Sequence, residues 1–126
     1  MSEMKKIDGI LLYVEDLEAS IKFYEVALGL HRGWTDEENR MIGFVFPGND
    51  TELVIHTAPG IPNPSFSIQV EDVETYCKHL AEKGYKVLKE PFDVRCGRCA
   101  SLVDPSGNII DIIDLTKFEG KPRYDE

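Results

Sequence analysis

The feature that most constrains the fold of this chain is an internal repeat. The stretch ILLYVEDLEASIKFYEVALG (10–29) aligns with FSIQVEDVETYCKHLAEKGY (66–85) at an offset of 56 residues, so that VEDLE falls on VEDVE. Each copy begins as an apolar strand and reaches Asp16 or Asp72, whose short carboxylate can accept the N–H groups of a first helical turn. Apolar residues then recur at helical spacing, as far as Leu28 in the first copy and Leu80 in the second. We therefore expect the chain to fold as two copies of one strand–helix unit.

Three short strands are predicted after each helix, because runs of β-branched and aromatic residues are separated there by turn residues. They cover 30–35, 40–46 and 51–57 in the first copy, and 85–90, 97–103 and 108–115 in the second. Pro91 and the Asp-Pro-Ser-Gly turn separate the later strands, and a Pro- and Gly-rich stretch links the copies. A chain of 126 residues has room for one sizeable core. We therefore predict one domain, 1–126, built from two βαβββ repeats at about 5–57 and 63–116.

Composition and charge narrow the class of protein. The net charge of −9 argues against a nucleic-acid partner, because such binding relies on Lys and Arg side chains that neutralise phosphates. The same charge is compatible with a cationic ligand. No apolar run approaches the ~20 residues of a membrane span, and the start of the chain lacks the features of a signal peptide. We therefore expect a cytoplasmic protein that does not bind a membrane.

The cysteines raise the question of a metal or redox site. Cys96 and Cys99 form a C-x-x-C pair, but no second pair supplies the other two ligands of a structural zinc. A redox C-x-x-C normally opens a helix, which lowers the thiol pKa, whereas this pair runs into a predicted strand. Residues three apart on a regular strand also point to opposite faces. We therefore expect neither chemistry, and Cys77, on the apolar stripe of its helix, is predicted to be a core residue.

Two stretches carry a resemblance to a known family. ILLYVEDLEASIKFYEVALGL (10–30) resembles the opening strand and helix of the glyoxalase/bleomycin-resistance/dioxygenase family, the vicinal oxygen chelate superfamily. CGRCASLVDPSGNIIDI (96–112) resembles the closing hairpin of that family, in which a Gly-Arg strand enters an Asp-Pro-x-Gly-Asn turn. The resemblance implies an α+β fold of two βαβββ modules whose mixed sheet forms a cup, commonly completed in a homodimer, with a small-molecule ligand inside. It does not fix the reaction, since the family includes lyases, epimerases, dioxygenases and drug-binding proteins.

In metal-dependent relatives, four strand positions supply His and Glu side chains to one divalent ion. The resemblance puts these positions on Gly9, Ser65, Asp111 and either Val54 or Glu52. The hydrophobic pattern favours Val54, and the distance from the preceding turn glycine favours Glu52. Glycine has no side chain to offer, and a serine hydroxyl is a poor ligand for zinc, nickel or iron. We therefore expect no transition metal and no other cofactor, while a Mg²⁺ or Ca²⁺ site built from two carboxylates stays an alternative.

Further residues are candidates for ligand contacts. Strand alternation puts Glu52 and His56 on one face, so an acid and an imidazole could both face the ligand. Trp34, the only tryptophan, is a candidate to clamp a flat or cationic ligand. Phe44 and Phe46 share a strand face and are either pocket lining or core.

Two more candidates lie near the C-x-x-C pair. Cys96 occupies a position where many members of the resembled family carry an aromatic residue, and it is either a pocket-lining thiol or an ordinary strand residue. Arg98 is either a solvated side chain or a counter-ion for an anionic group of the substrate. If it is buried next to Asp111, it would be paired with that carboxylate.

Two functional hypotheses follow. The first is a metal-independent protein that binds a small molecule, as drug-sequestering members of the family do. The second is an enzyme, a glyoxalase-like lyase or isomerase in which Asp111 acts with Glu52 or His56 as base and a divalent ion or Arg98 stabilises the oxyanion. A ring-cleaving dioxygenase ranks third, because its 2-His-1-carboxylate iron site cannot be assembled at these positions.

Overall fold

The computed structural model describes residues 4–118, and within them the chain divides into two compact units. The first unit comprises residues 9–65, and the second comprises residues 4–8 and 66–118. The units match the two sequence repeats closely, except that the start of the first strand belongs to the second unit. Whether the two units behave as one domain stays a prediction. No helix in the described residues is long and apolar enough to cross a membrane.

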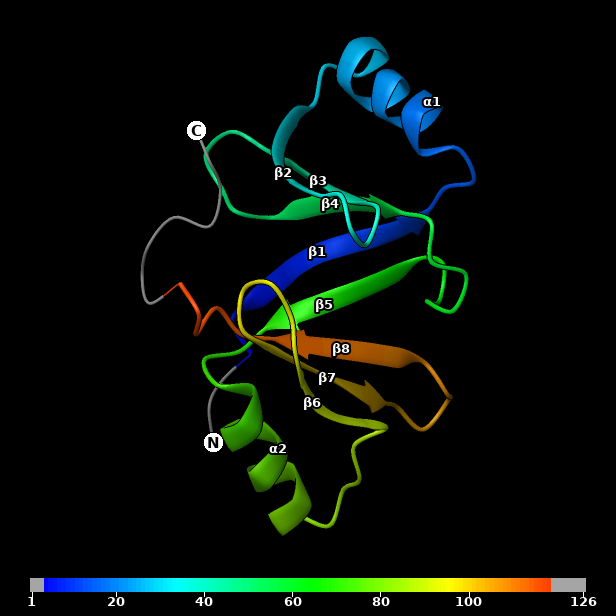
Figure 1. The fold of residues 1–126 in the computed structure, drawn as a ribbon. Coiled ribbons are helices and arrows are strands. Elements are labelled where there is room, and N and C mark those ends of the chain that lie inside the picture. The colour runs from blue at the N-terminus through cyan, green and yellow to red at the C-terminus, as the bar shows by residue number, and fades with distance from the viewer. Residues whose placement is uncertain (1–3, 119–126) are drawn as a thin grey trace. The chain divides into compact units, whose positions relative to one another are not determined.

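The first unit has the strand–helix–three-strand order that the repeat predicts (Figure 1). Its elements are β1 (Lys6–Tyr13), α1 (Leu17–Lys22), a π-helical turn η1 (Phe23–Ala27), β2 (His31–Asp36), β3 (Met41–Val45) and β4 (Glu52–His56). The strands lie in the order β2-β3-β4-β1. Because β1 runs parallel to β4 while β3 runs antiparallel to it, the sheet is mixed.

The second unit repeats this arrangement (Figure 1). Its elements are β5 (Ser65–Gln69), α2 (Val73–Glu82), β6 (Lys89–Asp93), β7 (Arg98–Val103) and β8 (Ile109–Ile113). The strands lie in the order β5-β8-β7-β6, with β5 parallel to β8. The start of β1 joins this unit through Lys5, whose backbone N–H donates to the carbonyl of Gln69 at 2.8 Å.

Both helices begin where the sequence predicts. The Asp16 carboxylate accepts the N–H of Ala19 at 3.0 Å, and the Asp72 carboxylate accepts the N–H of Thr75 at 3.0 Å. These are equivalent caps in the two copies. The first helix then widens into η1, and the apolar stripe predicted to reach Leu28 is lost, because the π turn changes the helical phase and leaves Leu28 54% exposed.

Each helix covers one face of its own sheet. Under α1, Leu17 packs with Ile42, Phe44 and Ile55. Under α2, a second core is made by Val70, Val73, Tyr76, Cys77, Ala100 and Ile112. Alternate residues of the strands therefore point away from the helices. We call these the α1-distal face, which carries Gly9, Trp34, Gly43, Glu52, Val54 and His56, and the α2-distal face, which carries Ser67, Cys99, Ser101 and Asp111.

Two expectations about β6 and Cys77 have different outcomes. Cys77 lies in the α2 core, as predicted. The strand expected at 85–90 instead runs over Lys89–Asp93 and contains Pro91, which was predicted to end it. Proline is tolerated there because β6 is the edge of its sheet and its pairing with β7 shifts between Lys89 and Phe92, so no ladder N–H is needed from Pro91.

Candidate functional site

A buried carboxylate and an indole meet on the α1-distal face. The Trp34 Nε1–H donates to Glu52 Oε2 at 3.0 Å, and Glu52 is only 6% exposed. A buried carboxylate is strongly stabilised by donors of this kind. The hydrogen bond fixes the edge of the indole ring next to the acid, so the two residues form one unit on this face.

A bulge and a glycine put Trp34 in this position. Pairing between β2 and β3 shifts between Arg32 and Trp34, so the two side chains lie on opposite faces although they are two residues apart. Arg32 lies on the α1 side, where its Nε forms an ion pair with Glu25 at 2.6 Å. On the other face, the indole lies against Gly43, where a Cβ atom would be 2.1 Å from Trp34 Nε1.

His56 lies on the same face as Glu52, at the other end of β4. Its side chain is fully buried and contacts the Tyr13 ring edge-on, with ring centroids 6.1 Å apart. The backbone N–H of Ala58 donates to His56 Nδ1 at 3.1 Å. Burial lowers the pKa of His56 below its ordinary value, because the charged ring would lose its hydration. The ring is therefore neutral at pH 7.

On the α2-distal face, Asp111 is held by a serine. Ser101 Oγ donates to Asp111 Oδ1 at 2.7 Å, and the two residues are directly paired between β7 and β8. Ser67 is paired with Asp111 from the other side, on β5. Sequence reasoning picked Asp111 but missed Ser101, which is identifiable only once the β7–β8 register is known.

Only one cysteine of the C-x-x-C pair lies on a strand. Cys99 lies on β7, but Cys96 lies in the loop before that strand, so the expectation of opposite strand faces does not apply to it. Neither cysteine is in a disulfide bond, and both are buried. Burial, followed by the negative charge of Asp111 and the proximity of Cys96, raises the pKa of Cys99 to about 12. Cys99 is therefore a protonated thiol at neutral pH, a poor nucleophile and a poor metal ligand.

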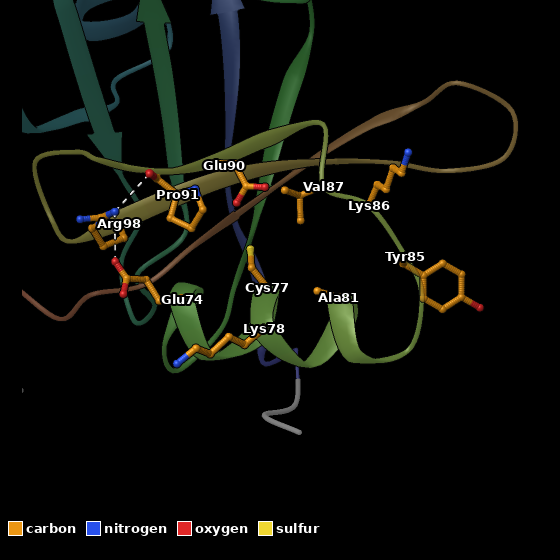
Figure 2. Close-up of a pocket in the computed structure, with 10 residues that line it drawn as sticks. All are labelled: Glu74, Cys77, Lys78, Ala81, Tyr85, Lys86, Val87, Glu90, Pro91 and Arg98. Atoms are coloured by element: carbon orange, nitrogen blue, oxygen red, sulfur yellow. Dashed lines mark hydrogen bonds and ion pairs between the residues drawn. The ribbon is translucent and has the colours of Figure 1, made fainter.

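Arg98 lies on the opposite side of β7 from Asp111, so the condition under which the two would pair is not met. Its side chain points to the α2 side, where it forms an ion pair with Glu74 at 3.1 Å and donates to the Pro91 carbonyl at 3.1 Å (Figure 2). A weaker ion pair joins it to Asp93 at 3.6 Å. Strand alternation requires this separation, because Arg98 and Asp111 occupy positions of opposite parity in the paired strands.

Arg98 lines an open groove between α2 and β6, of about 570 Å³ (Figure 2). The Cys77 and Ala81 side chains face β6 across it, and charged residues of both signs lie around its rim.

The structure also shows where the two phenylalanines that were candidates for ligand contacts lie. Phe44 is fully buried beneath α1 and belongs to the core, so it does not line the α1-distal face. Phe46 lies just beyond the end of β3 and is half-buried.

Comparison with protein families identifies the chain. A sequence model described as the Glyoxalase/Bleomycin resistance protein/Dioxygenase superfamily matches residues 6–112. The chain belongs to this superfamily. The α+β class, with two βαβββ modules and a mixed sheet, is thereby confirmed as the glyoxalase-type fold. A comparison with curated protein sequences finds no match.

Solved structures share the glyoxalase-type fold. Methylmalonyl-CoA epimerase from Mycobacterium tuberculosis has a TM-score of 0.71 at 18% identity, over 90% of each chain. The Streptomyces coelicolor epimerase in complex with 2-nitronate-propionyl-CoA has a TM-score of 0.68 at 20% identity, over 89% of this chain and 98% of that one. A 2,3-dioxygenase from Pseudomonas sp. KL28 has a TM-score of 0.68 at 21% identity, over 91% of this chain and 42% of that one. At these identities the likeness shows the fold alone.

The strand register decides which residue occupies the ambiguous metal position of the superfamily. Asp111 lies across from Ser67, and the repeat puts Ser67 on Leu11. Leu11 lies across from Val54, so Val54 is the counterpart of Asp111. Glu52 lies across from Gly9, one pair further along the strand. The acid nearest the predicted position is therefore displaced from it by two residues.

The side chains at the four superfamily positions do not fit a transition metal. Gly9 offers no ligand, and a Cβ built on it would lie 2.9 Å from the Glu52 carbonyl oxygen, so this backbone is too close for a histidine without movement. Val54 is apolar, Ser65 is a weak ligand and only Asp111 is a normal one. Within residues 4–118, no group of three or more His, Cys, Asp and Glu side chains is arranged to hold a metal ion.

Proposed function

We propose that this member of the glyoxalase superfamily binds a planar, cationic small molecule on its α1-distal face and does so without a transition metal. The ligand lies against the Trp34 indole, and its positive charge faces the Glu52 carboxylate. In keeping with the superfamily, we expect the protein to act as a homodimer in the cytoplasm. The expected homodimer is checked by light scattering coupled to gel filtration.

The hydrogen bond from Trp34 Nε1 to the buried Glu52 carboxylate is the observation that carries this proposal. It holds an aromatic ring and an anion side by side, which is the combination that recognises a flat cation. The net charge of −9 adds a long-range attraction for cations. The residues at the four metal positions of the superfamily support binding without a transition metal, because only one of the four, Asp111, is a good metal ligand.

Binding is testable through the protein's own fluorescence, because Trp34 is its only tryptophan. We expect ethidium, whose phenanthridinium ring system is a planar cation, to quench Trp34 on titration, and 8-anilinonaphthalene-1-sulfonate, an aromatic anion, to bind at least tenfold more weakly. Glu52→Gln should weaken ethidium binding about tenfold, which corresponds to the loss of about 1.4 kcal/mol. Glu38→Gln removes an exposed carboxylate from the β2–β3 turn and is the matched control. Equal binding of both dyes, or an unaffected Glu52→Gln variant, contradicts the proposal.

Metal independence has its own test. Protein purified without chelators should contain far less than one equivalent of zinc, nickel, iron, manganese or cobalt by elemental analysis, and EDTA should leave ethidium binding unchanged. A stoichiometric transition metal that is lost in Asp111→Ala would contradict the proposal that binding is independent of a transition metal.

A second candidate is an enzyme of the lyase, isomerase or epimerase type. The hydrogen bond between Ser101 and Asp111 favours it, because it orients a carboxylate that could take a proton next to a substrate carbonyl. Such an enzyme should turn over methylglyoxal–glutathione hemithioacetal or epimerise methylmalonyl-CoA, and Asp111→Asn should abolish the activity while ethidium binding persists. Absence of turnover with both substrates, with and without added Mg²⁺, Mn²⁺, Co²⁺, Ni²⁺ or Zn²⁺, counts against this candidate.

A further inference from the structure

His56 is a buried side chain with an unused hydrogen-bond donor. Its Nδ1 accepts the Ala58 N–H at 3.1 Å, so in the neutral ring the proton resides on Nε2. Within residues 4–118, this Nε2 atom has no hydrogen-bond partner although the side chain is fully buried. Buried N–H groups are nearly always paired, because losing hydration without gaining an acceptor is unfavourable. An acceptor that is not part of the described chain would remove this penalty.

The chemistry along β4 has a definite order. Glu52, Val54 and His56 share the α1-distal face, so an anion, an apolar side chain and an N–H donor follow one another along the strand. Leu11 and Gly43 lie across from Val54 on either side, which keeps the middle of the row apolar. At about 3.3 Å per residue, the Cα atoms of Glu52 and His56 are about 13 Å apart.

We infer that the ligand of this face is an elongated planar cation that also carries an acceptor oxygen, which receives the hydrogen bond of His56 Nε2–H. This inference rests on the proposed function. The cationic group lies at Glu52, the ring system crosses Val54 beside the Trp34 indole, and a carbonyl oxygen lies at His56. Three fused rings match a span of this order, whereas a single ring is too short to reach both ends.

The same geometry defines the role of His56. Neither ring nitrogen offers a free lone pair, because Nδ1 accepts from Ala58 and Nε2 carries the proton. The imidazole is therefore set to donate a hydrogen bond and has no free lone pair with which to remove a proton. This makes His56 a specificity-determining residue and excludes it as the general base in this tautomer.

Two probes that differ only in the acceptor test the inference. We expect 2-acetyl-6-(aminomethyl)anthracene to bind the intact protein about tenfold more tightly than 2-isopropenyl-6-(aminomethyl)anthracene, in which a CH₂ group replaces the carbonyl oxygen, as measured by Trp34 quenching. His56→Phe keeps an aromatic ring but removes the donor, and should bind the two probes equally. His56→Gln supplies an amide N–H near the position of Nε2 and should restore a preference of about threefold or more. His31→Phe removes an exposed histidine and should leave the preference unchanged.

The tautomer is measured independently of any variant. Two-bond ¹H–¹⁵N correlation spectra of the wild-type protein at pH 7 should show His56 as the neutral Nε2–H form. A protonated ring, or the Nδ1–H form, overturns the inference even if all variants fail to fold. If wild type binds both probes equally, the inference about the acceptor oxygen is overturned, while the proposed function stands. If neither probe nor ethidium binds, the proposed function fails and the inference fails with it.

Discussion

Cys99 shows how the surroundings of one residue remove a reactivity that its sequence motif suggests. A thiol in a C-x-x-C motif invites a redox or metal role, yet this one lies on a sheet face beside Asp111. Burial and that negative charge both oppose the thiolate. The motif therefore identifies two neighbouring thiols, and their environment decides that Cys99 is inert.

The raised pKa of Cys99 has a measurable consequence for stability. The thiol of the unfolded chain loses its proton near pH 9, whereas the folded chain holds it to about pH 12. Its contribution is therefore constant below pH 9 and is lost as the pH rises from 9 towards 12. Between pH 7 and pH 10, we expect wild type to lose about 1 kcal/mol more unfolding free energy than Cys99→Ala, measured by urea denaturation. Equal losses in the two proteins would mean that the thiolate is tolerated in the fold.

At the scale of elements, the C-terminal end of β8 joins three parts of the second unit. Asp114 is 1% exposed, and its carboxylate accepts the backbone N–H of Val73 at the start of α2 and of Arg98 at the start of β7. Thr116 donates to it through its hydroxyl at 2.8 Å. Gly97 makes room for this carboxylate, since a Cβ there would lie 2.1 Å from Asp114 Oδ1. One side chain thus ties helix, strand and loop together.

Removing this carboxylate should be severely destabilising. Asp114→Ala leaves the buried N–H groups of Val73 and Arg98 without acceptors, at about 1–3 kcal/mol each, so we expect a loss of about 3 kcal/mol or more in unfolding free energy. Chemical denaturation measures it. Asp93→Ala removes a 70% exposed carboxylate from neighbouring β6 and should cost less than about 1 kcal/mol. Similar losses in the two variants would show that the buried hydrogen bonds of Asp114 contribute little.

At the scale of the whole molecule, β1 belongs to both compact units. Its residues from Gly9 onward pair with β4 in the first unit. In the second unit, Lys5 donates to the Gln69 carbonyl and the buried Asp8 carboxylate accepts from Gln69 Nε2 at 2.8 Å. A strand with hydrogen bonds in both units cannot leave one of them without disturbing the other. We therefore expect the units to unfold together.

The distribution of natural probes makes cooperative unfolding easy to test. The only tryptophan, Trp34, reports on the first unit, and all three cysteines report on the second. Tryptophan fluorescence and pulse labelling of the thiols should give the same urea midpoint. Midpoints that differ by more than the error of the fits would show two independently unfolding units.

The sequence by itself determined the repeat, the capping aspartates and the two βαβββ modules. Each of these depends on residues close together in the chain, so local periodicity and hydrogen-bonding capacity are enough to reveal it. Asp111 was picked through the resemblance of the Asp-Pro-Ser-Gly-Asn turn and the strand after it to the closing hairpin of the superfamily. The choice of Val54 over Glu52 at the superfamily's metal position could not be made from the sequence, because the register of a strand depends on its partner strand.

Only the tertiary structure decided which side chains meet. A bulge turns Trp34 to the face of Glu52 and Arg32 to the opposite face, although strict alternation would put them on the same side. Register places Ser101 against Asp111 and sends Arg98 to α2. Pairing between strands that are distant in the chain sets these directions, because each ladder hydrogen bond belongs to two strands at once. The chemistry of the α1-distal face therefore becomes visible only after the strands have been assembled.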